Sequence, residues 1–565
     1  MNAKTKSAQR ITTKQIFTWM ALAAFLWIGV FAVSCRRPES AVRPKLLLFI
    51  VVDQLRADAV SLHPERFGPA GFRYLMDHGL WYVNARYRHA TTLTAVGHAV
   101  LFTGADAAQH GIPGNDWYDE ATGGHVYCFE DPAERILGQK NGPHEGTSPR
   151  NLTSTTIGDE IVRASGGTSR VFGVSLKDRG AIMAAGRSGK GFWYWAPSGE
   201  FVTSSFYYSD VPDWVARWNG VRPSAQYAGR SWDLLKPRST YTSGQADDRP
   251  AEKPPLTLGR TFPHALPKDV SKDLFSVLET TPFGDELTLD FIFTLLDAER
   301  IGQGSALDVL GLSLTATDYI GHAFGPDSLE YEDQVLRVDA LLAKLFVAVD
   351  RKIGLSNTLI VLTADHGVDL IPEIRQADRF PAGRLYPDAM RGRLNEALRK
   401  KFRAESLCLG FYNPCFFLDE GKIRRLGLDR EAVEDAAAEA LRAEPGVAWA
   451  VTRTAFMLGR VPHSPIFSML QAAFHPRRSG GVTIVPNQGW YLYPEPDRYA
   501  AMHGTPYDYD IHVPLFIAGP GIRSGVVGRA VCPQDLAVTV ASFLGTAAPT
   551  GSSGFPLTEV FGSQK

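Results

Sequence analysis

The chain has little cysteine and almost no net charge. It contains five cysteines among 565 residues, and no C-x-x-C pair, which argues against a zinc site built from thiolates. The formal net charge is −1 at pH 7, so the charge balance indicates neither a nucleic-acid partner nor a basic membrane patch. No internal repeat and no low-complexity tract interrupts the chain. These absences leave an ordinary globular protein as the starting expectation.

The remaining composition favours a large folded protein. Hydrophobic residues make up 44% of the chain and charged residues 21%, which is typical of a globular domain with a sizeable core. A length of roughly 150 residues per domain corresponds to two to four domains. A single large α/β domain with insertions fits the length equally well.

The N-terminus has the features of an export signal. Basic residues precede an apolar run, Phe17–Val33, and Ser34 and Cys35 follow it. Residues 1–35 are therefore predicted to direct export to a bacterial cell envelope, with the mature chain in the periplasm. Cys35 follows a short stretch that resembles a lipoprotein cleavage box, which predicts a tether through a lipid on this residue. The alternative is an uncleaved membrane anchor, since a span needs about 17–25 apolar residues.

The rest of the chain divides by composition. We expect a linker at 36–45, one catalytic domain at 46–550 and a C-terminal tail at 551–565. Two stretches within the domain, at about 180–290 and 370–480, interrupt its pattern of apolar runs. They are interpreted as insertions that form a cap near the site.

Continuous apolar runs predict a buried parallel sheet. Several runs are followed closely by a polar residue or a glycine, as expected of strands covered on both faces: 45–53, 171–176, 309–314, 359–362 and 513–518. Helical periodicity lies between them; Val335, Val338, Leu342 and Leu345 fall on one face. The predicted fold is α/β, with a mostly parallel central sheet and helices on both faces. In such folds, ligands bind beyond the carboxyl ends of the strands.

Seven residues have the chemistry of a two-metal site, and all but His503 fall just after such a run or at a helix start. They are three carboxylates, three imidazoles and one hydroxyl: Asp53, Asp318, Asp365, His322, His366, His503 and Thr94. Oxygen and nitrogen ligands of this kind suit two zinc ions, and the hydroxyl could serve as a nucleophile. Manganese or iron in one site is the alternative. Several neighbours are interpreted as supporting or structural residues: His98, His110, Asp508, Asp510 and His512.

Thr94 is the candidate nucleophile because it begins an expected helix, 95–102. Free N–H groups and partial positive charge at a helix start favour an alkoxide and a phosphate. The alternative is a threonine that only caps the helix.

Asp318 and His322 are four residues apart and can meet on one helix face. His503 could instead be a surface-loop histidine.

Together the motifs resemble the alkaline phosphatase superfamily, in particular the phosphate-irrepressible bacterial alkaline phosphatases related to the type I phosphodiesterase/nucleotide pyrophosphatases. The segments that carry the resemblance are VVDQLRAD (51–58), TLTAVGH (92–98), HGIPGND (110–116), SLKDRG (175–180), TATDYIGHAFGP (315–326), LTADHG (362–367) and HGTPYDYDIHVP (503–514).

The resemblance implies a complete active site. One zinc would be bound by Asp53, Thr94, Asp365 and His366. The second zinc would be bound by Asp318, His322 and His503. Thr94 would carry a phosphoryl group, while three residues would hold the phosphate oxygens: Asn115, Lys177 and Arg179. The one departure is Leu93, which stands where many phosphodiesterase relatives carry a basic residue before the nucleophile.

Charge counting favours small phosphate monoesters as substrates. The charges of two zinc ions balance those of three carboxylates and an ionised Thr94, so Lys177 and Arg179 are left to match a dianionic monoester. A diester is a monoanion and needs this pair less. A phosphodiesterase or nucleotide pyrophosphatase is the main alternative, and a silent envelope binding protein is another. A sulfatase is disfavoured because the chain has no C-x-P-x-R sequence.

Overall fold

The structure is a computed structural model that describes residues 43–140, 145–244 and 246–562. Residues 44–565 form one compact unit. The predicted signal segment, Cys35 and nearly all of the predicted linker lie outside the described residues. Within the described residues, none of the helices has both the length and the apolar character that a membrane crossing requires.

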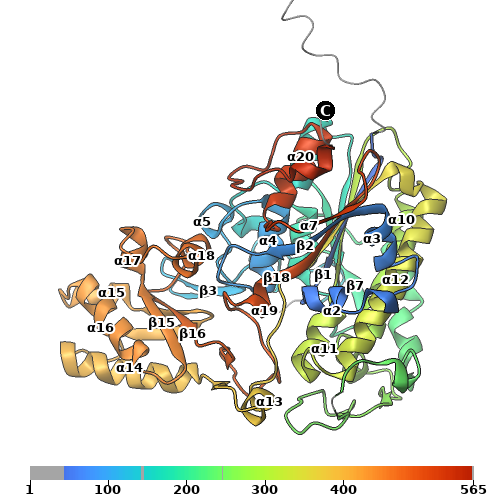
Figure 1. The fold of residues 1–565 in the computed structure, drawn as a ribbon. Helices are drawn as coiled ribbons and strands as arrows, with labels where there is room; N and C mark the ends of the chain where they lie inside the picture. Colours follow the sequence, from blue (N-terminus) through green and yellow to red (C-terminus); the bar gives the residue numbers. More distant parts are fainter. Residues whose placement is uncertain (1–42, 141–144, 245, 563–565) are drawn as a thin grey trace, which may run out of the picture. The chain divides into compact units, whose positions relative to one another are not determined.

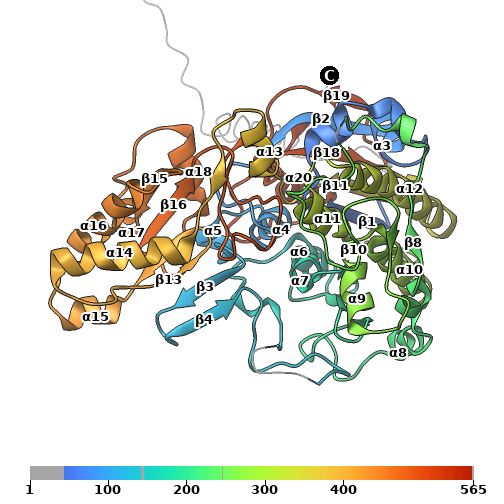
Figure 2. The same ribbon diagram turned by 90° about the horizontal axis from the view of Figure 1, so that it is seen from below.

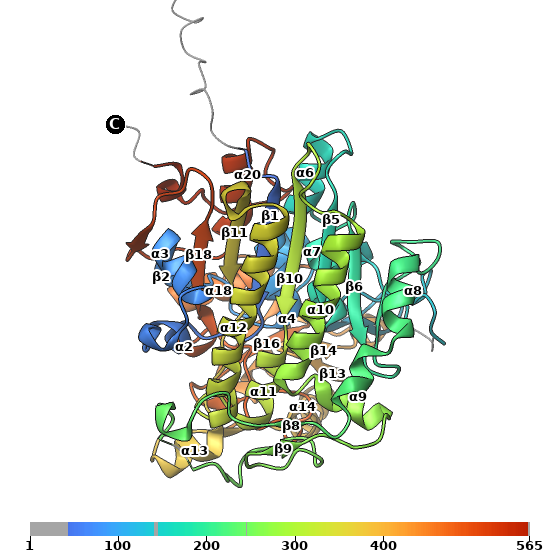
Figure 3. The same cartoon turned by 90° about the vertical axis from the view of Figure 1, so that its right-hand side faces the viewer.

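A nine-stranded sheet forms the centre of this unit (Figures 1 and 3). In spatial order its strands are β19 (Gly525–Val527), β2 (Gly79–Arg86), β18 (His512–Ala518), β11 (Thr358–Thr363), β1 (Leu46–Val52), β10 (Asp308–Leu314), β5 (Val171–Ser175), β6 (Lys190–Trp195) and β7 (Glu200–Val202). The five strands from β11 to β6 run parallel to one another. β1 is apolar throughout and every one of its residues is buried, as a strand covered on both faces requires.

Helices cover both faces of the sheet, as Figure 3 shows for the nearer face. One face carries α3 (Phe72–His78), α10 (Pro282–Ala298), α11 (Ala316–Phe324) and α12 (Leu329–Lys352). The other carries α4 (Thr94–Thr103), α6 (Ile157–Ala164), α7 (Asp178–Ala185) and α20 (Asp535–Leu544). The apolar positions that predict a helix around Val338 lie within α12 and are buried. The predicted fold class, a mostly parallel α/β sheet between two helical layers, is confirmed.

The direction of one strand differs from the prediction. The run at 513–518 is expected to be a parallel strand, but β18 is antiparallel to both β11 and β2. A single apolar run contains no signal of strand direction, so the sequence could not show this. The reversal places the amino end of β18, and the loop before it, at the edge where the parallel strands have their carboxyl ends.

The stretch at 180–290 contributes to the central sheet through β6 and β7. Their aromatic side chains belong to the main hydrophobic core; Phe192 and Phe201 pack around Phe291 of α10. Further elements in this stretch are α8 (Asp213–Gly220), β8 (Ser231–Trp232), β9 (His264–Ala265) and α9 (Lys272–Leu278).

The stretch at 370–480 belongs largely to a second sheet with its own core, which we call the small lobe, residues 387–486 (Figure 2). Its antiparallel strands, in spatial order, are β13 (Cys408–Tyr412), β14 (Cys415–Leu418), β16 (Val482–Pro486) and β15 (Val447–Thr452). Two helices pack on this sheet: α14 (Pro387–Phe402) and α16 (Arg430–Arg442). The four described cysteines are free thiols: Cys128, Cys408, Cys415 and Cys532.

Short elements connect these layers. They are α2 (Ala57–Ser61), α5 (Ala107–His110), β3 (Asp116–Asp119), β4 (Gly124–Tyr127), α13 (Pro372–Ala377), β12 (Gly383–Arg384), α15 (Glu420–Arg425), α17 (Arg453–Met457), α18 (Pro465–Ala473), β17 (Trp490–Tyr491) and α19 (Asp508–Ile511). The last described residues pack onto α20 through a 3-10 turn, Thr558–Phe561.

Candidate metal centre

The structure brings the candidate ligands together at the carboxyl edge of the central sheet. Asp53 directly follows β1, and Asp365 and His366 follow β11. α11 begins just after β10 and carries two more candidates, Asp318 and His322. Thr94 is the first residue of α4, and His503 lies in the loop before α19 and β18. Because β18 is antiparallel, this loop returns to the edge where the other ligands lie.

Four of these residues form what we call the Thr94 group: Asp53, Thr94, Asp365 and His366. The Nε2 atom of His366 is at its centre, 3.4 Å from Thr94 Oγ1, 3.6 Å from Asp53 Oδ1 and 3.4 Å from Asp365 Oδ2. All four side chains are buried. A hydroxyl, two carboxylates and an imidazole therefore face one small volume.

The other three residues form what we call the His503 group: Asp318, His322 and His503. Asp318 Oδ1 is 3.3 Å from His322 Nε2 and 3.5 Å from His503 Nε2. The one-turn spacing on α11 places Asp318 and His322 side by side, as expected for residues four apart. The rings of His366 and His503 stack with centroids 3.6 Å apart, so the two groups are neighbours.

Backbone carbonyls orient all three imidazoles in the same way. The Nδ1 atom of His322 donates to Ala501 O at 2.9 Å, and that of His503 donates to Thr92 O at 2.6 Å. His366 Nδ1 donates to its neighbour's carbonyl, Gly367 O, at 3.0 Å. A proton held on Nδ1 leaves the Nε2 lone pair directed at the carboxylates. This is the arrangement that metal-binding histidines adopt.

The electrostatics of the cluster favour bound cations. Burial, reinforced by Asp318 and Asp365, raises the pKa of Asp53 well above its usual range. Burial lowers the pKa of His366 to about 3, which keeps this imidazole neutral and able to act as a ligand. Asp53 Oδ1 is buried and has no hydrogen-bond partner among the described residues, and Asp365 Oδ2 is buried against the imidazoles of His98 and His366. Carboxylate oxygens of this kind are otherwise costly to bury, so the donor set fits divalent metal ions.

Lys177 links the two groups. Its Nζ donates to Asp53 Oδ2 at 2.8 Å and to Asp318 Oδ2 at 2.5 Å, and all three side chains are buried. Asn115 lies at the start of α4, where its Oδ1 accepts from Ala95 N at 3.1 Å. The Lys177 ammonium group thus lies at the carboxyl end of β1, and the Asn115 amide lies at the amino end of α4.

Arg179 is the third candidate phosphate-binding residue. Its side chain is half-buried, and its Nε has no hydrogen-bond partner among the described residues. Its pKa stays well above the usual value despite burial, because Tyr127, Tyr319 and nearby carboxylates favour the charged form. The guanidinium therefore remains a cation that can bind an anion.

Gln54 is a part of the site that the sequence reasoning missed. Its backbone N–H donates to Asp365 Oδ1 at 3.1 Å, and its Nε2 donates to Asp318 Oδ1 at 2.7 Å. It thereby touches a carboxylate of each group. Its φ of 67° is unusual for a residue other than glycine, and such backbone strain concentrates at functional sites. The available signal was its position directly after Asp53.

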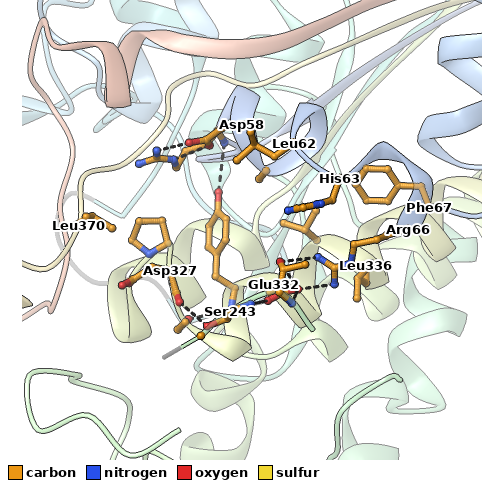
Figure 4. A pocket seen from close by; sticks show the side chains of 18 residues that line it. Asp58, Leu62, His63, Arg66, Phe67, Ser243, Asp327, Glu332, Leu336 and Leu370 are labelled. Carbon is orange, nitrogen blue, oxygen red and sulfur yellow. Dashed lines mark hydrogen bonds and ion pairs between the residues drawn. The ribbon is translucent and has the colours of Figure 1, made fainter. Parts of the chain in front are cut away.

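Tyr331 of α12 supports Gln54 from behind. Its hydroxyl donates to Gln54 O at 2.8 Å and accepts from Arg56 N at 3.3 Å. Tyr331 lines a pocket of about 290 Å³, together with Asp58 of α2 and Leu336 of α12, which Figure 4 labels. Arg56 and Asp58 form an ion pair at 2.5 Å, and both also line this pocket. Gln54 is therefore held by packed, hydrogen-bonded neighbours.

His98 also supports the cluster, as the sequence interpretation expects. Its Nδ1 lies 3.1 Å from Asp365 Oδ2, and its Nε2 lies 3.1 Å from Ser313 Oγ. Gly97 leaves room for this arrangement, because a Cβ there would lie 2.3 Å from Asp365 O. Close packing between α4 and the end of β11 thus positions Asp365.

A mostly parallel sheet with this cluster at its carboxyl edge defines the class of the protein. Residues 47–506 match the family described as type I phosphodiesterase / nucleotide pyrophosphatase. The chain belongs to this family, within the alkaline phosphatase superfamily, and is a hydrolase.

Among individual proteins, the chain is similar to bacterial alkaline phosphatases. The chain is 34% identical to alkaline phosphatase PafA of Elizabethkingia meningoseptica, over 95% of this chain and 98% of PafA. It is 34% identical to alkaline phosphatase PhoV of Synechococcus elongatus, over 93% of this chain and 94% of PhoV. The crystal structure of PafA superposes with a TM-score of 0.86 at 35% identity, and covers 92% of this chain and 99% of that one.

A second PafA structure bears on the candidate residues. That protein carries substitutions at one threonine, one asparagine, one lysine and one arginine, in this order along its chain. The four positions are separated by the same numbers of residues as Thr94, Asn115, Lys177 and Arg179 are here. The structure of murine ectonucleotide pyrophosphatase / phosphodiesterase 5 shares the fold at a TM-score of 0.51 and 17% identity.

Proposed function

We propose that the protein is an exported phosphomonoesterase that binds two zinc ions and hydrolyses small phosphate monoesters to inorganic phosphate. The observation that carries this proposal is the position of Lys177, whose Nζ bonds a carboxylate of each ligand group. A fixed cation inside a metal cluster is suited to a phosphoryl group with two negative charges. The relatives named alkaline phosphatases support the same reading.

The reaction proceeds in two displacements at phosphorus. Thr94 Oγ1 loses its proton and attacks, the bond from phosphorus to the ester oxygen breaks, and the alcohol departs after gaining a proton. Water then attacks the phosphothreonine, the bond from phosphorus to Oγ1 breaks, and inorganic phosphate leaves while Thr94 regains its proton. The partial positive charge at the start of α4 stabilises the negative charge at Oγ1 in both steps.

The ligand residues have distinct parts in this scheme. The Thr94 group would hold one zinc ion and the His503 group the other. Bound zinc would supply positive charge that lowers the pKa of a coordinated oxygen and stabilises the phosphoryl group. Asn115, Lys177 and Arg179 would donate hydrogen bonds to phosphate oxygens, and each such donor is usually worth about 3–4 kcal/mol in the transition state.

The direct test is hydrolysis of phenyl phosphate and of diphenyl phosphate by the purified protein, with its metal content measured in the same preparation. We expect a strong preference for the monoester and two zinc equivalents per chain. A strong preference for the diester would overturn the assignment. A metal-free, inactive preparation that zinc does not restore would instead favour a silent binding protein.

A phosphodiesterase or nucleotide pyrophosphatase is the second candidate, because the matching family carries that description. Arg179→Ala separates the two. A monoester needs this cation to match its second charge, so its turnover should fall far more than diester turnover. Equal losses for the two ester types would favour the phosphodiesterase.

We also propose that residues 1–35 export the protein to the periplasm and that Cys35 can carry a lipid tether. The basic start and the apolar run at 17–33 support this proposal. Mass spectrometry of the mature N-terminus tests it. A lipid on Cys35 is expected, and an intact uncleaved N-terminus would point to a membrane anchor.

A further inference from the structure

A cavity of about 330 Å³ opens beside the candidate phosphate-binding residues, beyond the ends of β5 and β6. Lys177 and Arg179 form part of its wall. Lys177 Nζ also lies 5.0 Å from the centre of the Tyr319 ring, which is another part of the wall. The cavity therefore adjoins the place where the phosphoryl group would bind, and it can hold the alcohol part of an ester.

Aromatic rings dominate one side of this cavity. Tyr127, Trp195 and Tyr319 line it, and all three are only half-buried, so part of each ring is open to a ligand. They come from β4, β6 and α11, three elements far apart in the sequence. Rings from separate elements around one cavity offer their faces to a flat group or to a cation.

Three carboxylates complete the wall: Glu145, Asp178 and Glu279. Asp178 accepts a hydrogen bond from Tyr127 Oη at 2.6 Å, and Glu279 is 3.5 Å from Tyr319 Oη. Asp178 and Glu279 are thus each attached to one of the rings. Thr147 also lines the cavity; it is 5% exposed, and its Oγ1 has no hydrogen-bond partner among the described residues. A buried hydroxyl without a partner indicates that the cavity receives a polar ligand.

The charges around the cavity favour a substrate whose alcohol is positively charged over one whose alcohol is neutral. In the free protein, Lys177 and Arg179 lie on the wall together with three acids: Asp178, Glu279 and Glu145. A bound phosphoryl dianion would take up both cations and leave the acids uncompensated in a partly buried place. A positive charge on the alcohol of the substrate would offset part of this negative charge, whereas a neutral alcohol would not.

We propose that this cavity binds the alcohol part of phosphate monoesters in which that alcohol carries an ammonium group, with the rings of Tyr127, Trp195 and Tyr319 and the carboxylate of Glu279 around the cation. This inference rests on the proposed phosphomonoesterase function and adds a substrate class to it. A carboxylate and several ring faces are together the usual recognition of a quaternary ammonium ion.

The test compares two esters that differ only in charge: choline phosphate and its neutral isostere 3,3-dimethylbutyl phosphate. We expect kcat/KM to be about tenfold higher for choline phosphate, the size of a cation–π contribution of about 1–2 kcal/mol. Glu279→Gln should remove most of this preference, so the ratio of the two kcat/KM values should fall towards one. Zinc content and turnover of phenyl phosphate show whether the variant is folded.

Glu286→Gln is the matched control, since this residue lies on α10 near Glu279 but does not line the cavity. Its ratio should equal that of the wild type. Equal kcat/KM values for the two esters in the wild type would overturn the proposal, as would a Glu279→Gln variant with an unchanged ratio. A preference for glucose 6-phosphate over both would show that the cavity binds a polyol instead. If phenyl phosphate is also not hydrolysed, the phosphomonoesterase function fails, and this inference with it.

Discussion

The two ligand groups of the metal centre are built differently. The Thr94 group sits on the rigid frame of the molecule, because Asp53, Asp365 and His366 follow central strands and Thr94 begins a buried helix. The His503 group depends on a helix and a loop. Two of its members lie on α11, and His503 lies in a loop between the small lobe and β18. The first group is thus positioned by the central strands and the start of α4, whereas the second also requires the chain to return to the sheet at His503.

This difference separates the residue that would attack phosphorus from the residues that only bind metal. The hydroxyl that would attack phosphorus belongs to the group on the frame, where its position costs little to maintain. The group that includes the loop contains only ligands. A change in the first group should therefore affect the reaction itself, whereas a change in the second should act through occupancy of its metal.

The largest effect is expected for Thr94→Ala. Removal of the nucleophile should lower kcat for phenyl phosphate by at least about a thousandfold, while zinc content stays close to that of the wild type. Thr94→Ser keeps the hydroxyl and is the matched control, with most of the activity retained. Rapid quenching followed by phosphopeptide mapping should find phosphate on residue 94 only in the wild type and the serine variant. An alanine variant with unchanged kcat would remove the distinction between the groups.

A smaller effect is expected when each group loses one ligand. His503→Ala should lose about one of two zinc equivalents and about a hundredfold in activity, and added zinc should restore part of that activity. Asp53→Ala should also lose zinc, but added zinc should not restore activity, because Asp53 also holds Lys177. Metal analysis by mass spectrometry and kinetics across a zinc titration check this. Equal rescue of both variants would contradict the division between frame and loop.

Gln54→Ala should have a somewhat smaller effect, mainly on the His503 group. Gln54 donates hydrogen bonds to Asp318 and, through its backbone, to Asp365. Loss of the side chain removes only the bond to Asp318, so we expect about a 10- to 100-fold loss of zinc affinity or activity, centred on the His503 group. Gln54→Glu keeps the size of the side chain but places a negative charge beside Asp318, and should be worse than alanine. Equal activity in all three proteins would exclude a positioning role.

The smallest effect is a pH dependence of stability near α11. Burial raises the pKa of Glu279 to about 7, although Lys177 and Arg179 limit the rise. The folded protein therefore holds this proton more tightly than the unfolded chain does. Its contribution to stability is fully present below about pH 4.5 and is lost as the pH rises through about 7.

Urea unfolding at pH 5 and pH 8.5 checks this sign. Glu279→Gln cannot ionise, so its free energy of unfolding should fall less between the two pH values than that of the wild type, by roughly 2 kcal/mol. Parallel changes in both proteins would show that another group accounts for the pH dependence.

Much of the fold was predictable because the central strands are buried on both faces. A run such as 46–52 has no polar position, and only a sheet between two helical layers accommodates it. The direction of β18 was not predictable, since the apolar run at 513–518 has the same appearance in either direction. The contribution of β6 and β7 to the sheet was missed because both strands lie in a stretch that is also rich in Ser, Pro and Gly, although the aromatic residues of β6 favour a strand.

The candidate ligands could be chosen from the sequence because each of them follows a recognisable run or motif. Their convergence could not, since it depends on α11 starting directly after β10 and on the return of the chain at His503. Gln54 shows a different limit. Its role comes from an unusual φ and from hydrogen bonds to residues more than 260 positions away, which a local pattern does not encode.

The antiparallel course of β18 has a consequence for how the molecule is held together. The chain leaves the sheet after β11, forms the small lobe, and comes back through His503 before it enters β18. A metal ion shared by His503 and α11 would act as a reversible cross-link that closes this long segment into a loop. Chelation should therefore make the segment around residue 503 the first place where a protease cuts.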